Sequence, residues 1–319
     1  MSKLYSIGEL LIDFQSVGTG SIKETVQFIK NAGGAPANVC VQAVKLGAQA
    51  VYLTKVGDDG FGEFLIETLK NEGVGVSFIS KSREYDTSLA FVSFREDGER
   101  EFSFYRRACA DLHFKPEDFA GVNFERGDVL EYGSVALKTG DARDTHISLI
   151  EKAEKSGALI CFDPNLRFNL WESREELKET VNEFLKYADI IKVGLDELEF
   201  ITGESGQSAV NKMFGGKLKL LLVTDGGNRT FLYCADGRSF SCKGYKVKTV
   251  DTTGAGDSFF GAFIAQLLDA KITPETVFNT GADYEKMLDF ACKCGAYTTT
   301  GYGAIPAMGN RENVEKAVK

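Results

Sequence analysis

The run Ala158-Leu159-Ile160-Cys161-Phe162, followed at once by Asp163, is the stretch that best indicates the fold. Uninterrupted apolar runs of this length are typical of strands that are buried on both faces of a parallel sheet. Leu220-Leu221-Leu222-Val223 repeats the pattern and ends at Thr224. In such sheets ligands bind beyond the carboxyl ends of the strands, so Asp163 and Thr224 are candidate site residues.

On either side of these runs, short β-rich segments alternate with longer segments of helical character. The predicted pairs of strand and following helix are Val51–Val56 with Gly62–Asn71, Asp128–Tyr132 with Ala142–Lys155, Ala158–Phe162 with Arg174–Tyr187, and Ile190–Val193 with Asp196–Ile201. This alternation predicts an α/β fold with a central, mostly parallel sheet flanked by helices. We expect residues 1–319 to form one domain.

Two segments break the alternation, approximately residues 14–30 and 86–107. In the second, Ser88–Phe94 and Glu101–Tyr105 flank the pair Asp97-Gly98, which favours a tight hairpin turn. The two segments could be surface hairpins without function. We expect them instead to form a small β-sheet lid over the ligand edge of the main sheet.

The composition narrows the classes of function. The net charge of −9 argues against binding to nucleic acid or to an anionic membrane surface, because phosphate contacts need clustered lysine and arginine. No apolar run approaches the roughly eighteen residues of a membrane span, and the first residues do not resemble a secretory signal. We therefore expect a cytoplasmic protein. Because the only histidines are His113 and His146, carboxylates, amides and cations are expected to carry any catalysis.

The strongest local signal is Asp251-Thr252-Thr253-Gly254-Ala255-Gly256-Asp257, which leads into an apolar helix. Backbone N–H groups at a helix start attract anions, and Gly254 and Gly256 let that backbone approach closely. Asp257, just inside this anion hole, could accept a proton from a hydroxyl that attacks phosphorus. Its place in the first helical turn favours the ionised carboxylate, and hence a weak base. The alternative is a glycine-rich turn whose aspartate only complements the helix dipole.

A second signal is Asn31-Ala32-Gly33-Gly34-Ala35-Pro36-Ala37-Asn38, which precedes a helix that ends near Leu46. The glycines permit a tight approach of the backbone, and Asn38 offers both a donor and an acceptor, which suits sugar hydroxyls. A loop that enters a helix would explain the glycines and the proline without any role for Asn38. A Walker-type phosphate loop and a dinucleotide fingerprint are both missing from the sequence.

Together the two motifs resemble those of the ribokinase-like, or PfkB, carbohydrate kinase family, and the resemblance extends over essentially the whole chain. The family has a glycine-glycine-asparagine signature near its start and an Asp-Thr-x-Gly-Ala-Gly-Asp signature near its end. The resemblance implies a mostly parallel sheet with a β-lid over the sugar. It also implies transfer of a phosphoryl group from ATP to a sugar hydroxyl.

The resemblance further implies roles for individual residues. The catalytic base matches Asp257, and the anion hole matches Gly254, Ala255 and Gly256. The sugar-contacting positions match Asp13, Gly33, Gly34 and Asn38. Glu197 matches a glutamate that organises Mg²⁺, although the asparagine of that motif is Gly194 here. Thr224 and Gly226 match a nucleotide-binding stretch whose last glycine is Arg229, and Ala291 and Gly295 match the adenine region. A monovalent cation, potassium, is implied near the backbone of Asp251 and Thr253.

Three stretches resemble fructokinases in particular, at residues 104–111, 163–171 and 299–307. They contain Arg106, Asp163 and Arg167, and each arginine could place a planar group of five donors over an oxygen-rich ligand. Fructose, converted to fructose 6-phosphate, is therefore the expected substrate. The alternatives are a 2-keto-3-deoxygluconate kinase, a nucleoside kinase, or an inactive sugar or nucleotide sensor. Pairing of two lids predicts a homodimer.

Overall fold

The computed structural model describes residues 2–94, 100–138 and 140–318. Within these residues, nine strands form the main sheet, in the order β13-β12-β11-β10-β9-β8-β1-β4-β5. Neighbouring strands from β11 to β5 run parallel, whereas β12 pairs antiparallel with both β11 and β13. The predicted α/β fold with a mostly parallel central sheet is confirmed. The antiparallel hairpin at one edge was not expected from the sequence.

The main sheet contains strands at the segments predicted near residues 51–56, 128–132, 158–162, 190–193 and 220–224, and further strands that were not predicted. Their bounds are β1 Lys3–Ile7, β4 Gln49–Gly57, β5 Gly75–Ser82, β8 Val129–Gly133, β9 Leu159–Asp163, β10 Ile190–Gly194, β11 Leu220–Asp225, β12 Arg229–Cys234 and β13 Ser239–Lys243.

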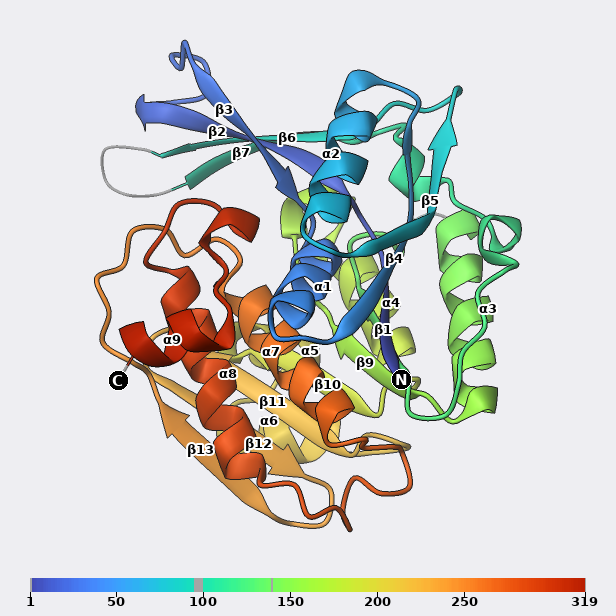
Figure 1. The fold of residues 1–319 in the computed structure, drawn as a ribbon, viewed down its shortest axis with the longest axis vertical. Helices are drawn as coiled ribbons and strands as arrows, with labels where there is room; N and C mark the ends of the chain where they lie inside the picture. The colour runs from blue at the N-terminus through green and yellow to red at the C-terminus, as the bar shows by residue number, and fades with distance from the viewer. Residues whose placement is uncertain (1, 95–99, 139, 319) are drawn as a thin grey trace.

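Helices cover both faces of this sheet (Figure 1). They are α1 Ala35–Lys45, α2 Gly60–Asn71, α3 Gly140–Ser156, α4 Arg174–Leu185, α5 Leu195–Thr202, α6 Gly206–Met213, α7 Ala255–Asp269, α8 Tyr284–Thr298 and α9 Arg311–Ala317. Short 3-10 turns lie at Ala110–Leu112, Pro116–Phe119, Phe168–Leu170 and Ile305–Ala307.

The apolar runs are buried on both faces because successive side chains of a strand point in opposite directions. Leu159 and Ile190 pack into a core with α1, α7 and α8. Their neighbours Ile160 and Ile191 pack into a second core with α3, α4 and α5. Each central strand therefore needs apolar residues at consecutive positions, as the sequence shows.

The lid is a separate sheet of strands in the order β3-β2-β6-β7, with bounds β2 Leu11–Thr19, β3 Phe28–Gly33, β6 Ser88–Phe94 and β7 Arg100–Tyr105. Figure 1 shows it as an arm that extends beyond the main sheet. The two insertions meet where β2 and β6 pair in parallel, with Leu11 opposite Ser88. The predicted lid is thereby confirmed. The tight turn expected at Asp97-Gly98 lies outside the described residues.

Across the described ranges, no helix combines the length and the apolar character that crossing a lipid bilayer requires.

Candidate active site

A cavity of about 700 Å³ lies at the carboxyl edge of the main sheet and extends under the lid. Residues just after β1, β8, β9 and β10 form its floor, and the lid strands and the start of α7 complete its wall. The site residues proposed from the sequence that line it are Asp13, Gly34, Asn38, Arg167, Glu197, Thr224, Thr253, Gly254, Gly256 and Asp257. The position of this cavity agrees with the expectation drawn from Asp163 and Thr224.

The first turn of α7 forms one wall of the cavity. Gly254 precedes the helix with a φ of 76°, and a Cβ atom there would lie 2.5 Å from the Cβ of Ala304. Only glycine fits this position, for both conformational and steric reasons. Among the described residues no side chain caps α7. The N–H of Ala255 donates to the carbonyl of Thr252 over 3.3 Å, which leaves the N–H groups of Gly256 and Asp257 for an anion in the cavity.

Asp257 lies in this first turn beside Asn38 from α1. The Nδ2 of Asn38 donates a hydrogen bond of 2.8 Å to the Oδ2 of Asp257. The Oδ1 of Asn38 is buried and has no hydrogen-bond partner among the described residues, which leaves an acceptor for a ligand hydroxyl.

Burial raises the pKa of Asp257, against the opposing effects of Lys192, Asn38 and Arg167. The helix position alone predicted a weak base. The surroundings in the folded chain make it a stronger one.

Asp13, in β2, faces the same cavity from the lid. Burial raises its pKa to about 7, although Arg167 lowers it. A Cβ atom at Gly33, in the neighbouring strand β3, would lie 2.0 Å from the Oδ2 of Asp13. The first glycine of the pair therefore makes room for this carboxylate.

Asp163 ends β9 and organises the loop that carries Arg167. Its Oδ1 accepts from the backbone N–H of Asn165, which has a φ of 44°, and its Oδ2 lies 2.8 Å from the Nζ of Lys192. Arg167 is exposed at the cavity, and its Nη1 donates to the carbonyl of Leu166. Asp163 is buried and does not line the cavity. Its contacts hold Asn165 and Lys192 in position.

Glu197 begins α5, with its carboxylate at the cavity. The N–H of Leu166 donates to its Oε1 at 2.7 Å, and the N–H of Gly194 donates to its Oε2 at 2.8 Å. No cluster of three His, Cys, Asp or Glu side chains that could hold a metal occurs in the described part of the chain. A magnesium ion bound to ATP phosphates keeps most of its water ligands and needs no cluster of protein ligands. A carboxylate held in one orientation, as Glu197 is, fits a contact with such an ion through one of these waters.

Further proposed residues lie in the loop before α7, at the end of β11 and in the turn after it. Asp251 accepts from the N–H and the hydroxyl of Thr253 through Oδ1, and from the N–H of Gly303 through Oδ2. This ties the loop before α7 to the segment near the C-terminus. Thr224 lines the cavity at the end of β11, and Gly226 lies in the turn that follows, with a φ of 49°.

Besides Asp163, the proposed residues that do not line the cavity are Gly33, Arg106, Gly226, Asp251, Ala255, Ala291 and Gly295. Arg106 is buried, with Nε and Nη2 each 3.1 Å from the Oδ2 of Asp111, and Nη1 2.9 Å from the carbonyl of Val135. Its Nε and Nη1 donate to protein groups, whereas Nη2, which is ion-paired with Asp111, makes no hydrogen bond among the described residues. Ala291 and Gly295 lie on α8, where a Cβ atom at Gly295 would meet the carbonyl of Ala255 at 3.0 Å. Their roles remain predictions.

Two charged residues of the cavity were not identified from the sequence, Glu9 and Lys192. Glu9 follows β1, accepts from the N–H of Ala35 at 3.0 Å, and has its pKa raised to about 7 by burial. Lys192 interrupts the otherwise apolar strand β10. An ionisable residue inside a buried strand, or directly after one, is the signal that could have revealed both.

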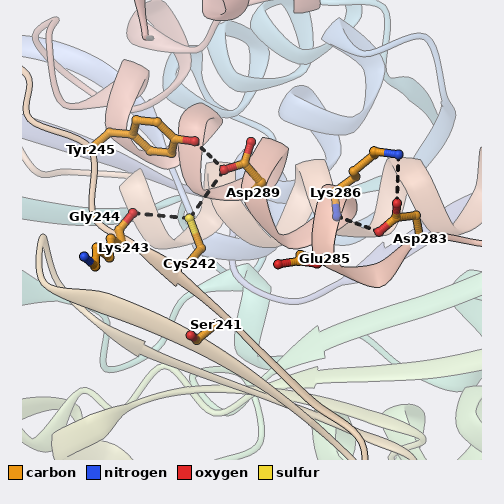
Figure 2. Close-up of a pocket in the computed structure, with 9 residues that line it drawn as sticks. All are labelled: Ser241, Cys242, Lys243, Gly244, Tyr245, Asp283, Glu285, Lys286 and Asp289. Atoms are coloured by element: carbon orange, nitrogen blue, oxygen red, sulfur yellow. Dashed lines mark hydrogen bonds and ion pairs between the residues drawn. The ribbon is translucent and has the colours of Figure 1, made fainter.

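A second cavity, of about 550 Å³, lies between β13 and the start of α8, away from these residues (Figure 2). Several of its polar groups contact one another. Tyr245 donates to Asp289, the thiol of Cys242 lies 3.7 Å from the same carboxylate, and Lys286 pairs with Asp283 at 2.9 Å. No residue proposed from the sequence lines this cavity.

Within the ranges that the structure describes, the main cavity thus combines a helix start without a side-chain cap, the partly buried carboxylate of Asp257 and a polar pocket under a lid, an arrangement that suits phosphoryl transfer to a hydroxyl. The sequence profile described as pfkB family carbohydrate kinase matches residues 1–310. The chain belongs to this family of carbohydrate kinases.

Curated relatives and solved structures agree with this membership. Fructokinase-2 of Solanum lycopersicum is 42% identical over 309 residues, which cover 96% of this chain and 92% of the relative. The fructokinase of Vibrio cholerae O395 with fructose, ADP and calcium bound has a TM-score of 0.88 and 30% identity, with 100% and 99% of the two chains covered. The fructokinase of Xylella fastidiosa with bound ATP has a TM-score of 0.86 and 28% identity, covering 99% and 98%.

Proposed function

We propose that the protein is a fructokinase, which transfers the γ-phosphoryl group of ATP to the 6-hydroxyl of D-fructose. The observation that carries this proposal is the hydrogen bond between Asn38 and Asp257 at the anion-binding start of α7. Because both residues line the cavity, this contact supports the proposal that an amide which binds the sugar and a general base act together there. The fructokinase names of relatives about as long as this chain support fructose over other sugars.

In the proposed reaction, Asn38 and Asp13 bind sugar hydroxyls, and Arg167 binds sugar oxygens from the rim of the cavity. Asp257 accepts the proton of the attacking hydroxyl, for which its raised pKa suits it. The N–H groups of Gly254, Ala255 and Gly256 stabilise negative charge on the phosphoryl oxygens. Thr224 and Gly226 contact the nucleotide at the end of β11, with Ala291 and Gly295 behind the adenine.

The proposed reaction involves two cations, Mg²⁺ and potassium. Mg²⁺ bound with ATP neutralises charge on the phosphate oxygens, and Glu197 would hold it through water. Potassium would bind at the backbone of Asp251 and Thr253. Because the carboxylate of Asp251 already accepts from Thr253 and Gly303, carbonyl oxygens of the loop would serve as its ligands.

ADP release from ATP, measured with a panel of fructose, 2-keto-3-deoxygluconate, ribose and adenosine, tests the proposal. We expect the highest kcat/KM with fructose, and fructose 6-phosphate as the product by phosphorus-31 NMR. Faster turnover of 2-keto-3-deoxygluconate or of adenosine would show that this compound, and not fructose, is the substrate. Binding of a sugar with no turnover of any would indicate a sensor.

We also propose that the protein forms a homodimer through the lid. Supporting this, exposed apolar side chains gather on the lid, with 93% exposure for Val26, 57% for Ile29 and 63% for Tyr105. A second lid would cover such residues and pair the open edges of the small sheet. The cytoplasmic location expected from the sequence likewise stays a prediction.

A further inference from the structure

We infer that Lys192 is a further catalytic residue, whose ammonium group binds the transferred phosphoryl group beside the start of α7. This inference rests on the proposed kinase function, and it assigns to phosphoryl transfer a side chain that the two sequence motifs do not contain.

Lys192 lies on β10, on the face of the sheet that packs against α1, α7 and α8, as does Ile190 two residues earlier. Its Nζ lies 3.0 Å from the point where a Cβ atom of Gly256 would be. The ammonium group therefore lies directly against Gly256, the second residue of α7. It lines the cavity together with Gly256, Asp257 and Glu197.

The ammonium group is buried but only partly satisfied by the protein. Its side chain is 9% exposed, and its one hydrogen-bond partner among the described residues is the Oδ2 of Asp163. An ammonium group has three N–H donors, so two remain for groups in the cavity. Buried donors without acceptors cost stability, which favours an anionic ligand at this place.

The protein also keeps this lysine charged. Burial opposes the charge, but the carboxylates of Asp163 and Glu197 outweigh it and raise the pKa of Lys192. Asp163 in turn is orientated by the N–H of Asn165. A fixed cation at the anion-binding helix start costs no reorganisation when negative charge develops there.

In the transfer, one bond to the γ-phosphorus forms and another breaks. The oxygen of the sugar hydroxyl forms a bond to the γ-phosphorus, and its proton moves to the carboxylate of Asp257. The bond from the γ-phosphorus to the bridging oxygen breaks, and ADP leaves with the electron pair. Lys192 keeps its proton throughout and donates hydrogen bonds to the non-bridging oxygens of the moving phosphoryl group.

Two substitutions test the inference, Lys192→Met alone and the double variant Lys192→Met/Asp163→Asn. The single change leaves the buried carboxylate of Asp163 unpaired and should lower the melting temperature. The double change removes that charge and should restore stability. In both variants we expect kcat with fructose to fall by about 10²–10³-fold, the effect typical of removing one donor to a developing oxyanion. The KM for fructose should stay within about threefold of the parent.

A binding measurement gives a second readout. With fructose present, both variants should bind ADP as the parent does, but should bind ADP with aluminium fluoride, a mimic of the transferring phosphoryl group, about 10²-fold more weakly. A double variant that recovers kcat to within fivefold of the parent, or binds the mimic normally, would overturn the role of Lys192 and leave only a structural ion pair. A parent protein that turns over none of the sugars would instead refute the proposed function.

Discussion

The side-chain amide of Asn38 donates to the carboxylate of Asp257 over 2.8 Å, although the two residues are 219 positions apart in the sequence. The contact forms because α1 and α7 pack side by side on one face of the main sheet. One carboxylate oxygen is held by the amide, and the other remains for the proton of a substrate hydroxyl. The motif proposed to bind the sugar and the motif proposed to bind phosphate thus meet at the carboxylate that is proposed to act as the base.

Asp257→Asn tests the base. Asparagine keeps the size and polarity but cannot take the proton, so kcat should fall by about 10²–10⁴-fold, with ATP binding nearly unchanged. This corresponds to roughly 3–5.5 kcal/mol on the transition state. Asp269→Asn, at the exposed far end of α7, serves as the matched control and should retain parental kcat. If the Asp257 variant turns over fructose within severalfold of the parent, the base lies elsewhere.

Arg167→Ala tests the sugar site. Loss of a charged hydrogen bond should be worth roughly 1.5–3 kcal/mol, so the KM for fructose should rise about 10–150-fold while the KM for ATP stays constant. The exposed Arg126, paired with Glu275 on another surface, provides the control substitution Arg126→Ala. A shift in the KM for ATP would place Arg167 in the nucleotide site.

Asp13→Asn tests the cost of burying a carboxylate for the sugar. The pKa of Asp13 is raised from 3.8 to about 7 in the folded chain, so the folded state holds the proton more tightly than the unfolded state. The ionised carboxylate therefore destabilises the fold increasingly from about pH 4 to about pH 7, and by a constant amount above. The neutral variant should be more stable than the parent by about 1–3 kcal/mol at pH 8.

Urea unfolding of both proteins without ligand, at pH 4.5 and pH 8, measures this difference. The advantage of the Asp13 variant should fall to roughly a quarter of its pH 8 value at pH 4.5, and its KM for fructose should be raised at pH 8. An equal advantage at both pH values would show that the ionisation of Asp13 does not cause it.

Glu197→Gln tests the proposed role in binding magnesium. The amide would hold the ion's water less strongly than the carboxylate, so we expect half-maximal activity to need about tenfold more Mg²⁺. Each carboxylate oxygen of Glu197 accepts a hydrogen bond from a backbone N–H group. Because glutamine replaces one of these oxygens by an NH2 donor, one of the two bonds is lost, which should cost about 1–3 kcal/mol of stability. Glu199→Gln, an exposed position on the same helix, is the control. An unchanged magnesium titration would limit Glu197 to its contacts with the backbone.

Ile29→Glu tests the lid as an interface. A charge at this half-exposed position of β3 should oppose pairing of two lids, so sedimentation should show a dimer for the parent and a monomer for the variant. Gln207→Glu, on α6 at a distance from the lid sheet, should leave the dimer intact. A parent that sediments as a monomer at micromolar concentration would refute the proposed homodimer.

By itself the sequence determined the features that depend on neighbouring residues. Apolar runs such as Ala158–Phe162 specify doubly buried strands, because every position of a central strand faces a layer of helices. Gly254 and Asp257 predicted a helix start suited to an anion, since the glycine that precedes the helix and the acid of its first turn lie within four residues of each other. The lid could also be anticipated, because its segments interrupt the alternation of strands and helices.

Only the tertiary structure decided how those local features act on one another. The contact of Asn38 with Asp257, the ammonium group of Lys192 behind Gly256, and the engagement of Arg106 by Asp111 all depend on which elements pack together. Burial likewise reversed the expectation for Asp257, because desolvation raises its pKa more than the cations and Asn38 nearby lower it. Desolvation and long-range contact arise only when distant segments close around a site, and no pattern of adjacent residues encodes them.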